Sequence, residues 1–286
     1  MGIPQELHAL IHDPADPELI AVRVRNDQPL DNSAHQVPRG VLFLLTEGLV
    51  AVQTARGRVL AGPRSIGWMP PHEAHSVQSF GPTAGVGLFL APRCCDTLPA
   101  EPAQFEAGAL ASLLMQRTLE WPAGVALSAP QRRLLQVLLD ELGQAATQSL
   151  HLPWPRDERL LSIARALLAN PASGRRLEHW ARFADVSART LSRKFVEETG
   201  MSFGQWRRWA RLTQALEWLA TGQAVKHVAL SLGYDSVSAF IKSFRLALGT
   251  TPAAYFGAMT RTNPARGAAV AQSPLSTPSP GDNDAL

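Results

Sequence analysis

The sequence predicts an α+β protein of two domains, an N-terminal β-barrel with packed helices and an all-α C-terminal domain. Three observations predict this division. Short apolar or alternating stretches, separated by Gly and Pro, fill the first 95 residues. A pattern of two short helices around a tight turn occurs twice near the C-terminus. The charge also divides: residues 1–155 hold 10 Lys or Arg against 14 Asp or Glu, and residues 156–261 hold 16 against 8.

Length and composition are consistent with two domains, each with its own hydrophobic core. A chain of 286 residues with 45% hydrophobic content can bury a core in each of two domains. The start, MGIPQELHAL, has no charged segment followed by an apolar run, and no apolar stretch approaches the length of a membrane span. We therefore expect a cytoplasmic protein without membrane contact. The adjacent Cys94 and Cys95 form no disulfide framework. We interpret them as incidental thiols at a domain edge rather than as a sensor of oxidants or soft metals.

The N-terminal domain, residues 1–150, is expected to be a small barrel or jelly roll. Strands are predicted at residues 19–25, 41–45, 49–54 and 85–90, where apolar residues alternate or run together. Gly and Pro turns separate these stretches, as is typical of antiparallel sheets with short connections.

A Pro-rich turn in this domain carries histidines. The segment GWMPPHEAHSV, residues 67–77, resembles the second motif of cupin barrels, in which such a turn precedes an inward-facing His. Metal-dependent cupins have two histidines one residue apart, then a carboxylate and a third histidine. Here His75 matches the third position, but Val37 stands where a histidine would follow His35. Since an iron or manganese site needs three or four protein ligands, we expect no metal and no other cofactor.

We expect the barrel interior to bind a small organic effector instead. The residues expected to line this site are His35, Arg39, Trp68 and His75. The alternative is that Trp68 fills the core and that the histidines are turn residues whose hydrogen bonds go to the backbone.

Two amphipathic helices are expected after the barrel, at residues 109–120 and 130–148. Pro122 ends the first, and Pro130 lies in the first turn of the second. The second helix carries a wide Leu and Val stripe. This stripe either only covers the barrel or also contacts a second subunit.

Residues 151–156 follow, with Pro153 and Pro155 on either side of Trp154. Consecutive X-Pro steps favour extended conformations, so we expect a short, stiff linker. Beyond the second domain, residues 262–286 are rich in Ala, Pro, Ser, Gly and Asp without periodicity, and we expect them to be disordered.

The repeated pattern covers residues 177–195, LEHWARFADVSARTLSRKF, and residues 225–244, VKHVALSLGYDSVSAFIKSF. Apolar residues occupy equivalent places in the two copies: Trp180, Ala181, Leu191 and Phe195 in the first, and Val228, Ala229, Phe240 and Phe244 in the second. The second copy has one extra residue in its turn. Each copy is typical of a helix-turn-helix, in which the second helix enters the DNA major groove.

The second helix of the first copy has a polar face. Ser187 is the expected N-cap, and inward Leu191 and Phe195 leave an outward face on the other side. The predicted DNA-contacting residues of this face are Arg189, Thr190, Ser192 and Arg193. An arginine there can donate two hydrogen bonds to guanine, which contributes roughly 1–3 kcal/mol of discrimination.

The equivalent face of the second copy is less polar. Ser236 is the expected cap, and the outward residues are predicted to be Val237, Ser238, Ile241 and Lys242. Val and Ile suit thymine methyl groups, so we expect the first copy to perform more of the base reading. The alternative, that both faces are ordinary solvated faces of a bundle, is disfavoured because the copies match and carry Arg193 and Lys242 at equivalent places.

Residues from about 155 to 256 resemble the DNA-binding domain of the AraC/XylS family of bacterial transcription regulators. The matching segments are SARTLSRKF, ETGMSFGQW, GYDSVSAFIKSFR and GTTPAAYF. The resemblance implies a domain, here residues 157–261, with two helix-turn-helix subdomains joined by a long helix at residues 203–219. Arg211 on this helix matches a family arginine. Trp206 stands where the family often has Tyr, and we expect it to pack rather than to contact bases.

The resemblance and the basic charge together imply a sequence-specific regulator that binds double-stranded DNA and is not an enzyme. An effector in the barrel would control DNA affinity or contact with RNA polymerase, and a homodimer is expected. Two alternatives are a metal-dependent cupin enzyme with a DNA-binding tail and a non-specific architectural DNA binder. Membrane binding is not expected, because there is no long basic amphipathic face.

Overall fold

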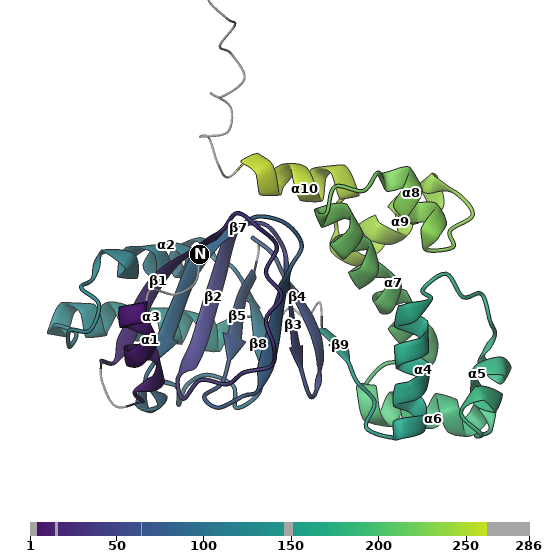
Figure 1. Ribbon diagram of the computed structural model, residues 1–286, viewed down its shortest axis with the longest axis horizontal. Coiled ribbons are helices and arrows are strands. Elements are labelled where there is room, and N and C mark those ends of the chain that lie inside the picture. Colours follow the sequence, from purple (N-terminus) through teal and green to yellow (C-terminus); the bar gives the residue numbers. More distant parts are fainter. Residues whose placement is uncertain (1–4, 15–16, 64, 146–150, 262–286) are drawn as a thin grey trace, which may run out of the picture.

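In the computed structural model, which describes residues 5–14, 17–63, 65–145 and 151–261, a sheet domain lies beside a helical domain (Figure 1). The strands are β1 (Leu19–Asn26), β2 (Gly40–Glu47), β3 (Val50–Thr54), β4 (Gly57–Ala61), β5 (Ser65–Met69), β6 (His75–Ser79), β7 (Thr83–Leu90), β8 (Ala103–Glu106) and β9 (His151–Pro153). The helices of the sheet domain are α1 (Gln5–His12), η1 (Pro92–Cys94), α2 (Ala109–Arg117), η2 (Thr118–Glu120) and α3 (Ala129–Gln144). Those of the helical domain are α4 (Glu158–Ala169), α5 (Leu177–Phe183), α6 (Ala188–Thr199), α7 (Phe203–Ala220), α8 (Val225–Ser231), α9 (Val237–Leu248) and α10 (Pro252–Arg261).

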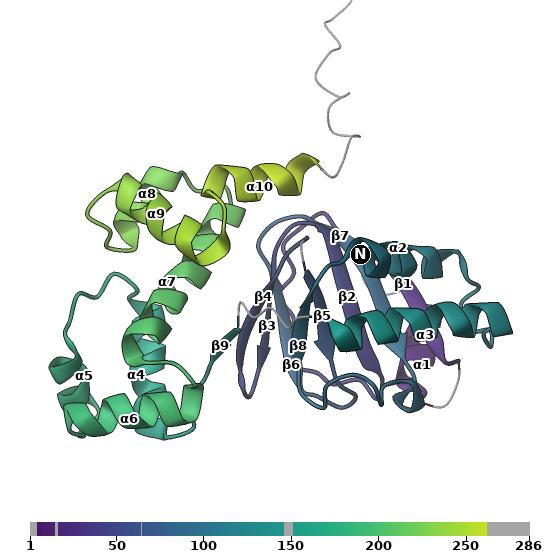
Figure 2. The same cartoon turned by 180° about the vertical axis from the view of Figure 1, so that it is seen from behind.

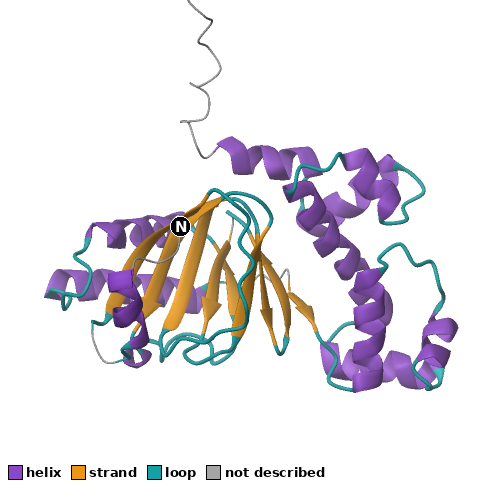
Figure 3. Ribbon diagram, viewed as in Figure 1, coloured by secondary structure: helices purple, strands orange, loops and turns teal. Residues whose placement is uncertain are grey.

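The α+β, two-domain prediction is confirmed, but the sheets do not close into one barrel (Figure 3). One antiparallel sheet has the order β1-β7-β2-β5-β8, and the other has the order β6-β3-β4-β9. Each sheet keeps two edges, whereas a closed barrel has none. A cupin-like barrel is therefore not confirmed. The four predicted strands are present as β1, β2, β3 and β7.

Successive side chains of the five-stranded sheet point to opposite faces, and both faces are apolar. Leu42 and Leu44 pack with α2 and α3, which cover the outer face of the sheet (Figure 2). Val41 and Phe43, the intervening residues, belong to a cluster that includes Val50 and other residues of the second sheet. The expected helices at residues 109–120 and 130–148 are thus the cover of this face. The last residues of the second expected helix, 146–148, lie outside the described residues. The tail predicted to be disordered, residues 262–286, also lies outside them.

The four-stranded sheet joins the two domains. On its outer side Leu49, Ala51 and Leu60 share one buried cluster with apolar residues of α7, among them Leu212, Leu216 and Leu219. Residues 151–153, predicted as linker, form strand β9, which pairs with β4. The chain therefore leaves the sheet as an edge strand and enters α4 after only four further residues, so the connection is short, as expected.

Helix α7 also organises the helical domain. Its first half contributes Trp206 and Ala210 to a core with α4, α5 and α6, and its second half joins the core of α8 and α9. The predicted joining helix is confirmed, ending at Ala220 instead of Leu219. Its 18 residues span about 27 Å at the usual rise. No helix in the described ranges has the length and apolar character needed to cross a membrane.

Caps define the two equivalent helices α6 and α9. Ser187 accepts a hydrogen bond from the Thr190 amide at 3.0 Å, and Ser236 accepts one from Ala239 at 3.1 Å, which confirms both predicted N-caps. At the other end, Gly200 and Gly249 adopt left-handed conformations with φ of 70° and 71°. These positive φ values favour glycine, and they end both helices at the same distance from their N-caps.

Asp157 links the beginning of α4 to α6. Its carboxylate accepts from the Arg159 amide at 3.0 Å and pairs with the Lys194 ammonium at 2.5 Å. The guanidinium of Arg159 and the ammonium of Lys194 hold the pKa of this carboxyl well below its usual range. A depressed folded-state pKa adds stability above the unfolded value, near 4, and that stability is lost as the pH falls below it.

We expect Asp157→Ala to lower the free energy of unfolding at neutral pH by about 1–2 kcal/mol, because it removes the cap of α4 and the Lys194 partner. Asp157→Asn is the matched control, since it keeps a capping oxygen but no charge. Urea unfolding at pH 7 and pH 3.5 measures both effects. The advantage of the native protein over the asparagine variant should be smaller at pH 3.5 but not abolished, because the unfolded carboxyl begins to bind a proton there while the folded one stays ionised. A pH-independent difference would show that the ion pair contributes nothing.

Candidate DNA-binding surface and apolar cavity

The polar face of α6 is oriented as predicted. Leu191 and Phe195 are fully buried, while Arg189 and Arg193 are exposed on the opposite side of the helix. Thr190 and Ser192 are half-buried; the Thr190 hydroxyl lies 2.8 Å from the Ser187 hydroxyl. The arrangement leaves both arginines on the solvent-exposed side of α6. Contact of these residues with DNA stays a prediction.

Arg193 is held by a neighbour on its own helix. Its Nη1 atom donates to both carboxylate oxygens of Glu197, at 2.6 and 2.7 Å. The two side chains are 59% and 51% exposed, and an exposed pair of this spacing contributes at most about 1 kcal/mol. A phosphate or a guanine edge can therefore displace the carboxylate, at a small cost in binding free energy.

The outward face of α9 is narrower than expected. Ser238 and Lys242 are exposed, but Val237 and Ile241 are half-buried and pack against the core of α8 and α9. Together with Phe240 they extend an apolar stripe with spacings of three and four residues, which directs a helix face inward. Val237 and Ile241 are thus less available than their place in the repeat predicts, whereas Lys242 and, three residues further along α9, Arg245 are exposed.

Two residues of α7 stabilise the helical domain. Arg211 donates from Nε to the Pro171 carbonyl at 2.8 Å and is half-buried, so it ties α7 to the turn after α4. This contact holds the subdomain together, and the predicted role of Arg211 in DNA binding is untested. Trp206 is fully buried and donates from Nε1 to the Pro153 carbonyl at 2.7 Å. Its predicted packing role is confirmed, and it fastens α7 to strand β9.

An apolar cavity of about 470 Å³ lies in the sheet domain. Both sheets line it, with Val22, Phe43 and Phe89 from one and Val52 and Val77 from the other. Residues of α1 form part of its wall. The volume suits a small organic molecule. The sequence did not single out these lining residues, because each strand reveals its alternation but not which face meets the other sheet.

Two of the four predicted cavity residues line this cavity, His35 and His75. Trp68 does not: it pairs in register with Leu42, faces α2 and α3, and donates from Nε1 to the Pro99 carbonyl at 2.8 Å. Arg39 is fully buried at the start of β2, where it donates to the Leu10 carbonyl at 3.2 Å and to the Pro17 carbonyl at 2.7 Å. Its role is to anchor the N-terminal segment.

His35 and His75 form a cross-strand pair. Each backbone amide donates to the carbonyl of the other residue, at 2.9 and 2.8 Å, and the ring centroids are 4.5 Å apart. The Nδ1 atoms lie 3.2 Å from the Ser33 carbonyl and 2.9 Å from the Glu73 carbonyl, respectively. His75 is buried, and this burial lowers its pKa.

The potential metal ligands and the two thiols are dispersed or buried. Among the residues that the structure describes, no group of three or more His, Cys, Asp or Glu is placed to hold a metal ion. Cys94 and Cys95 are free and half-buried. Burial raises the pKa of both thiols, that of Cys95 to about 11, so the reactive thiolate is disfavoured.

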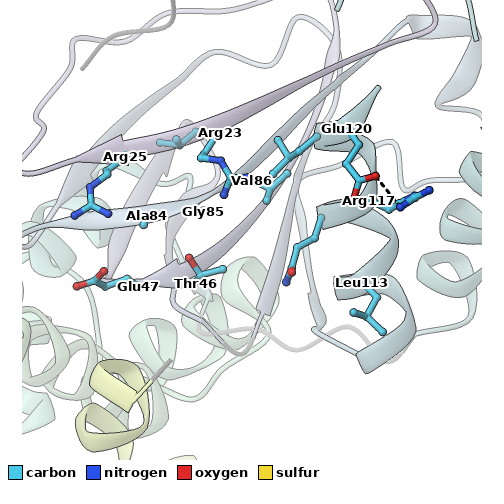
Figure 4. Close-up of a pocket in the computed structure, with 13 residues that line it drawn as sticks. Arg23, Arg25, Thr46, Glu47, Ala84, Gly85, Val86, Leu113, Arg117 and Glu120 are labelled. Atoms are coloured by element: carbon cyan, nitrogen blue, oxygen red, sulfur yellow. Dashed lines mark ion pairs between the residues drawn. The ribbon is translucent and has the colours of Figure 1, made fainter. Parts of the chain in front are cut away.

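A second depression, between edge strand β1 and helix α2, is open and charged (Figure 4). Arg23 and Arg25 line it from β1, and Arg117 lines it from α2. Arg25 pairs with Asp27 at 3.3 Å and Arg117 with Glu120 at 2.7 Å, so two of its three cations are already engaged by exposed carboxylates. This groove lacks the buried polar groups of a specific site.

Two capped helix-turn-helix units on one rod-like helix, beside a sheet domain with a cavity, define a class of two-domain DNA-binding regulators. A family model described as a helix-turn-helix domain matches residues 180–258. The HTH-type transcriptional regulator NimR of Escherichia coli K12 is 34% identical over 241 residues, which cover 82% of this chain and 86% of that protein. The chain therefore belongs to the AraC family of transcriptional regulators.

Two further similarities each cover about a third of the chain. The HTH-type transcriptional regulator RipA of Corynebacterium glutamicum is 38% identical over 104 residues, 36% of this chain and 31% of that protein. A crystal structure of the DNA-binding domain of AdpA in complex with a target DNA is 32% identical, with a TM-score of 0.34, and covers 36% of this chain and 94% of that one.

The Arg193–Glu197 pair can be tested directly. We expect Glu197→Gln to raise DNA affinity about two- to fivefold, because Arg193 no longer has to leave a carboxylate. Glu178→Gln, on the exposed side of α5, removes the same charge elsewhere in the subdomain and is the matched control. Fluorescence anisotropy of a labelled DNA fragment that the protein binds measures the affinity of each variant. An equal gain in both variants would assign the effect to net charge alone.

Proposed function

We propose that this protein is a sequence-specific transcriptional regulator whose two helix-turn-helix subdomains read adjacent major-groove segments under the control of a small molecule in the sheet-domain cavity. The observation that carries the proposal is the matched pair of capped helices, α6 and α9, on the single helix α7. Arg189 and Arg193 supply base contacts on α6, while Lys242 on α9 supplies phosphate contacts.

The four-stranded sheet provides a route from the cavity to the DNA-binding domain. Val50 and Val52 of β3 line the cavity, while Ala51 between them packs with α7 on the other face. A ligand that repositions β3 therefore acts on α7, the helix that sets the distance between the two helix-turn-helix units. We call these units the two reading heads. The ligand shifts DNA affinity or polymerase contact only to the extent that it binds one arrangement of this sheet and helix more tightly.

An ion pair crosses the same contact. Arg58 on β4 donates from Nη2 to Glu217 on α7 at 2.8 Å and to the Gln78 side chain at 3.1 Å. Gln214 donates to the second carboxylate oxygen of Glu217 at 3.0 Å. Burial raises the pKa of Glu217, whereas Arg58 opposes that rise. Glu217 thus has two polar partners, Arg58 and Gln214. Arg58 also has Gln78, although its Nε atom is buried without a hydrogen-bond partner. The pair links one position of the sheet to one position of the helix.

Helix α3 supplies a self-complementary surface for a homodimer. Leu134 and Val137 are 38% and 41% exposed on its outer side. Arg133 and Glu141 are both exposed and lie four residues before and after Val137. In an antiparallel pair of α3 helices with the two-fold axis at Val137, Arg133 of each protomer faces Glu141 of its partner.

The test of sequence reading is selection of bound fragments from random and genomic DNA by the full-length protein at physiological salt. A bipartite motif of two short blocks about one helical turn apart is expected. A specificity ratio near unity would instead indicate an architectural binder.

On the selected site, Arg193→Ala should lose about 1–3 kcal/mol of discrimination at one base position. Lys242→Ala should weaken binding to all sequences alike and reduce the salt dependence by about one counterion. Titrations at several salt concentrations distinguish the two effects. Uniform weakening by Arg193→Ala across sequences would place Arg193 on phosphate.

The dimer surface is tested by charge reversal. We expect Arg133→Glu to dissociate the dimer, because each Glu141 would then face an added carboxylate. Glu141→Arg should do the same, and the double variant should restore association, since the pairs are only exchanged. Sedimentation at several protein concentrations measures the oligomer. A double variant that is as weak as either single variant would contradict the antiparallel arrangement.

A further inference from the structure

The cavity in the sheet domain has few polar groups, and their states restrict what it can hold. We propose that it binds an uncharged, mostly apolar molecule that carries an N–H or O–H donor, accepted by Nε2 of His75 with His35 as a second acceptor. This inference rests on the proposed function in one respect only, that the cavity is the effector site.

The hydrogen bonds of the two histidines fix their tautomers. A carbonyl oxygen can only accept, so the Nδ1 atoms beside the Ser33 and Glu73 carbonyls must both carry the proton. In a neutral imidazole the other nitrogen is then an acceptor without a proton. No described residue donates to Nε2 of His35 or of His75. Two ring acceptors on one cavity wall are thus left for a ligand.

The backbone holds this pair in place. The reciprocal amide bonds between His35 and His75 make a two-residue antiparallel bridge, and its side chains stand next to each other on one face. His75 is only 8% exposed, whereas His35 is exposed, so the pair runs from the cavity interior towards solvent. A donor on the ligand therefore meets a preorganised acceptor rather than a mobile side chain.

Two other polar side chains of the lining are engaged by the backbone. Asn32 accepts from the Val77 amide at 2.6 Å, and Ser79 accepts from the Leu30 amide at 2.7 Å. Both hold the segment before His35 against β6. The histidine acceptors differ from these groups in being buried or paired on the cavity wall with an unused acceptor, and we assign the polar selectivity of the site to them.

The lining also argues against a charged ligand. It contains no Asp, Glu, Lys or Arg among the described residues, and its titratable groups are His12, His35 and His75. A carboxylate would lose its hydration without gaining a permanent cation. Burial and the neighbouring His35 lower the pKa of His75, which keeps that ring neutral and unable to donate from Nε2. An ammonium would likewise find no carboxylate.

Three naphthalene probes of similar shape test the proposal on the full-length protein at pH 7.5: 2-naphthol, 2-methoxynaphthalene and 2-naphthoate. We expect 2-naphthol to bind, 2-methoxynaphthalene to bind roughly five- to tenfold more weakly for want of one hydrogen bond, and 2-naphthoate to bind most weakly. Isothermal titration measures the three affinities. Equal binding of naphthol and its ether, tightest binding of naphthoate, or binding of none of them would each overturn the proposal.

Variants then locate the acceptor. His75→Phe keeps an aromatic ring of similar size but removes Nε2, so it should abolish the preference for 2-naphthol over the ether while the ether still binds. His227→Phe, at an exposed position of α8, is the control and should leave the preference unchanged. An undiminished preference in a folded His75→Phe protein would overturn the assignment. If that variant does not fold, the comparison of probes on the native protein still decides the ligand class.

The same samples keep this inference separate from the proposed function. If the probes follow the expected order but 2-naphthol and its analogues leave affinity for the selected DNA unchanged, the ligand class stands and control through the cavity fails. If DNA is read specifically but no probe binds, the regulator stands and the ligand class is wrong.

Discussion

The arrangement of both domains depends on the packing of helix α7 against the outer face of the four-stranded sheet. Leu212, Leu216 and Leu219 bury their side chains against Leu49 and Leu60, and the resulting cluster continues into the core of α8 and α9. Apolar burial on this scale is the largest favourable contribution that either domain offers the other. The sheet, the helix and the second reading head therefore form one packed unit. The first reading head is attached through the other half of α7 and through the strand that precedes α4.

That asymmetry assigns different tasks to the two subdomains. The first carries two exposed arginines on α6 and is joined to the sheet domain by Trp206 and the short strand β9. The recognition helix of the second subdomain, α9, is half apolar. This subdomain shares one buried cluster with α7 and the four-stranded sheet, whose other face lines the cavity. Under the proposed function, base discrimination and response to a ligand are therefore concentrated at opposite ends of one helix. The rigidity of that helix, with buried residues along both halves, is what connects them.

The sequence predicted features that are decided locally. The caps Ser187 and Ser236, the inward Phe195 and Phe244 and the extent of α7 follow from short-range hydrogen bonding and helical periodicity, and the structure agrees with each. Features that depend on contacts between residues far apart in the sequence were harder to predict. The side of the sheet to which Trp68 points depends on its register with β2, and closure of a barrel depends on pairing between edge strands. The half-burial of Ile241 reflects contact with a neighbouring helix that its own periodicity could not reveal.

Helix α7 has a consequence for the DNA as well. Because its two halves are buried in different cores, the helix can neither bend nor twist without disrupting one of them, so the angle between α6 and α9 is fixed. B-form DNA turns by about 35° for each base pair. Inserting a single base pair between the two half-blocks of a target would therefore rotate one of them away from its reading head. If the two helix-turn-helix units read adjacent segments as proposed, the targets of this protein are constrained in spacer length as strictly as in base sequence, and drift in spacing is a route by which genes leave its control.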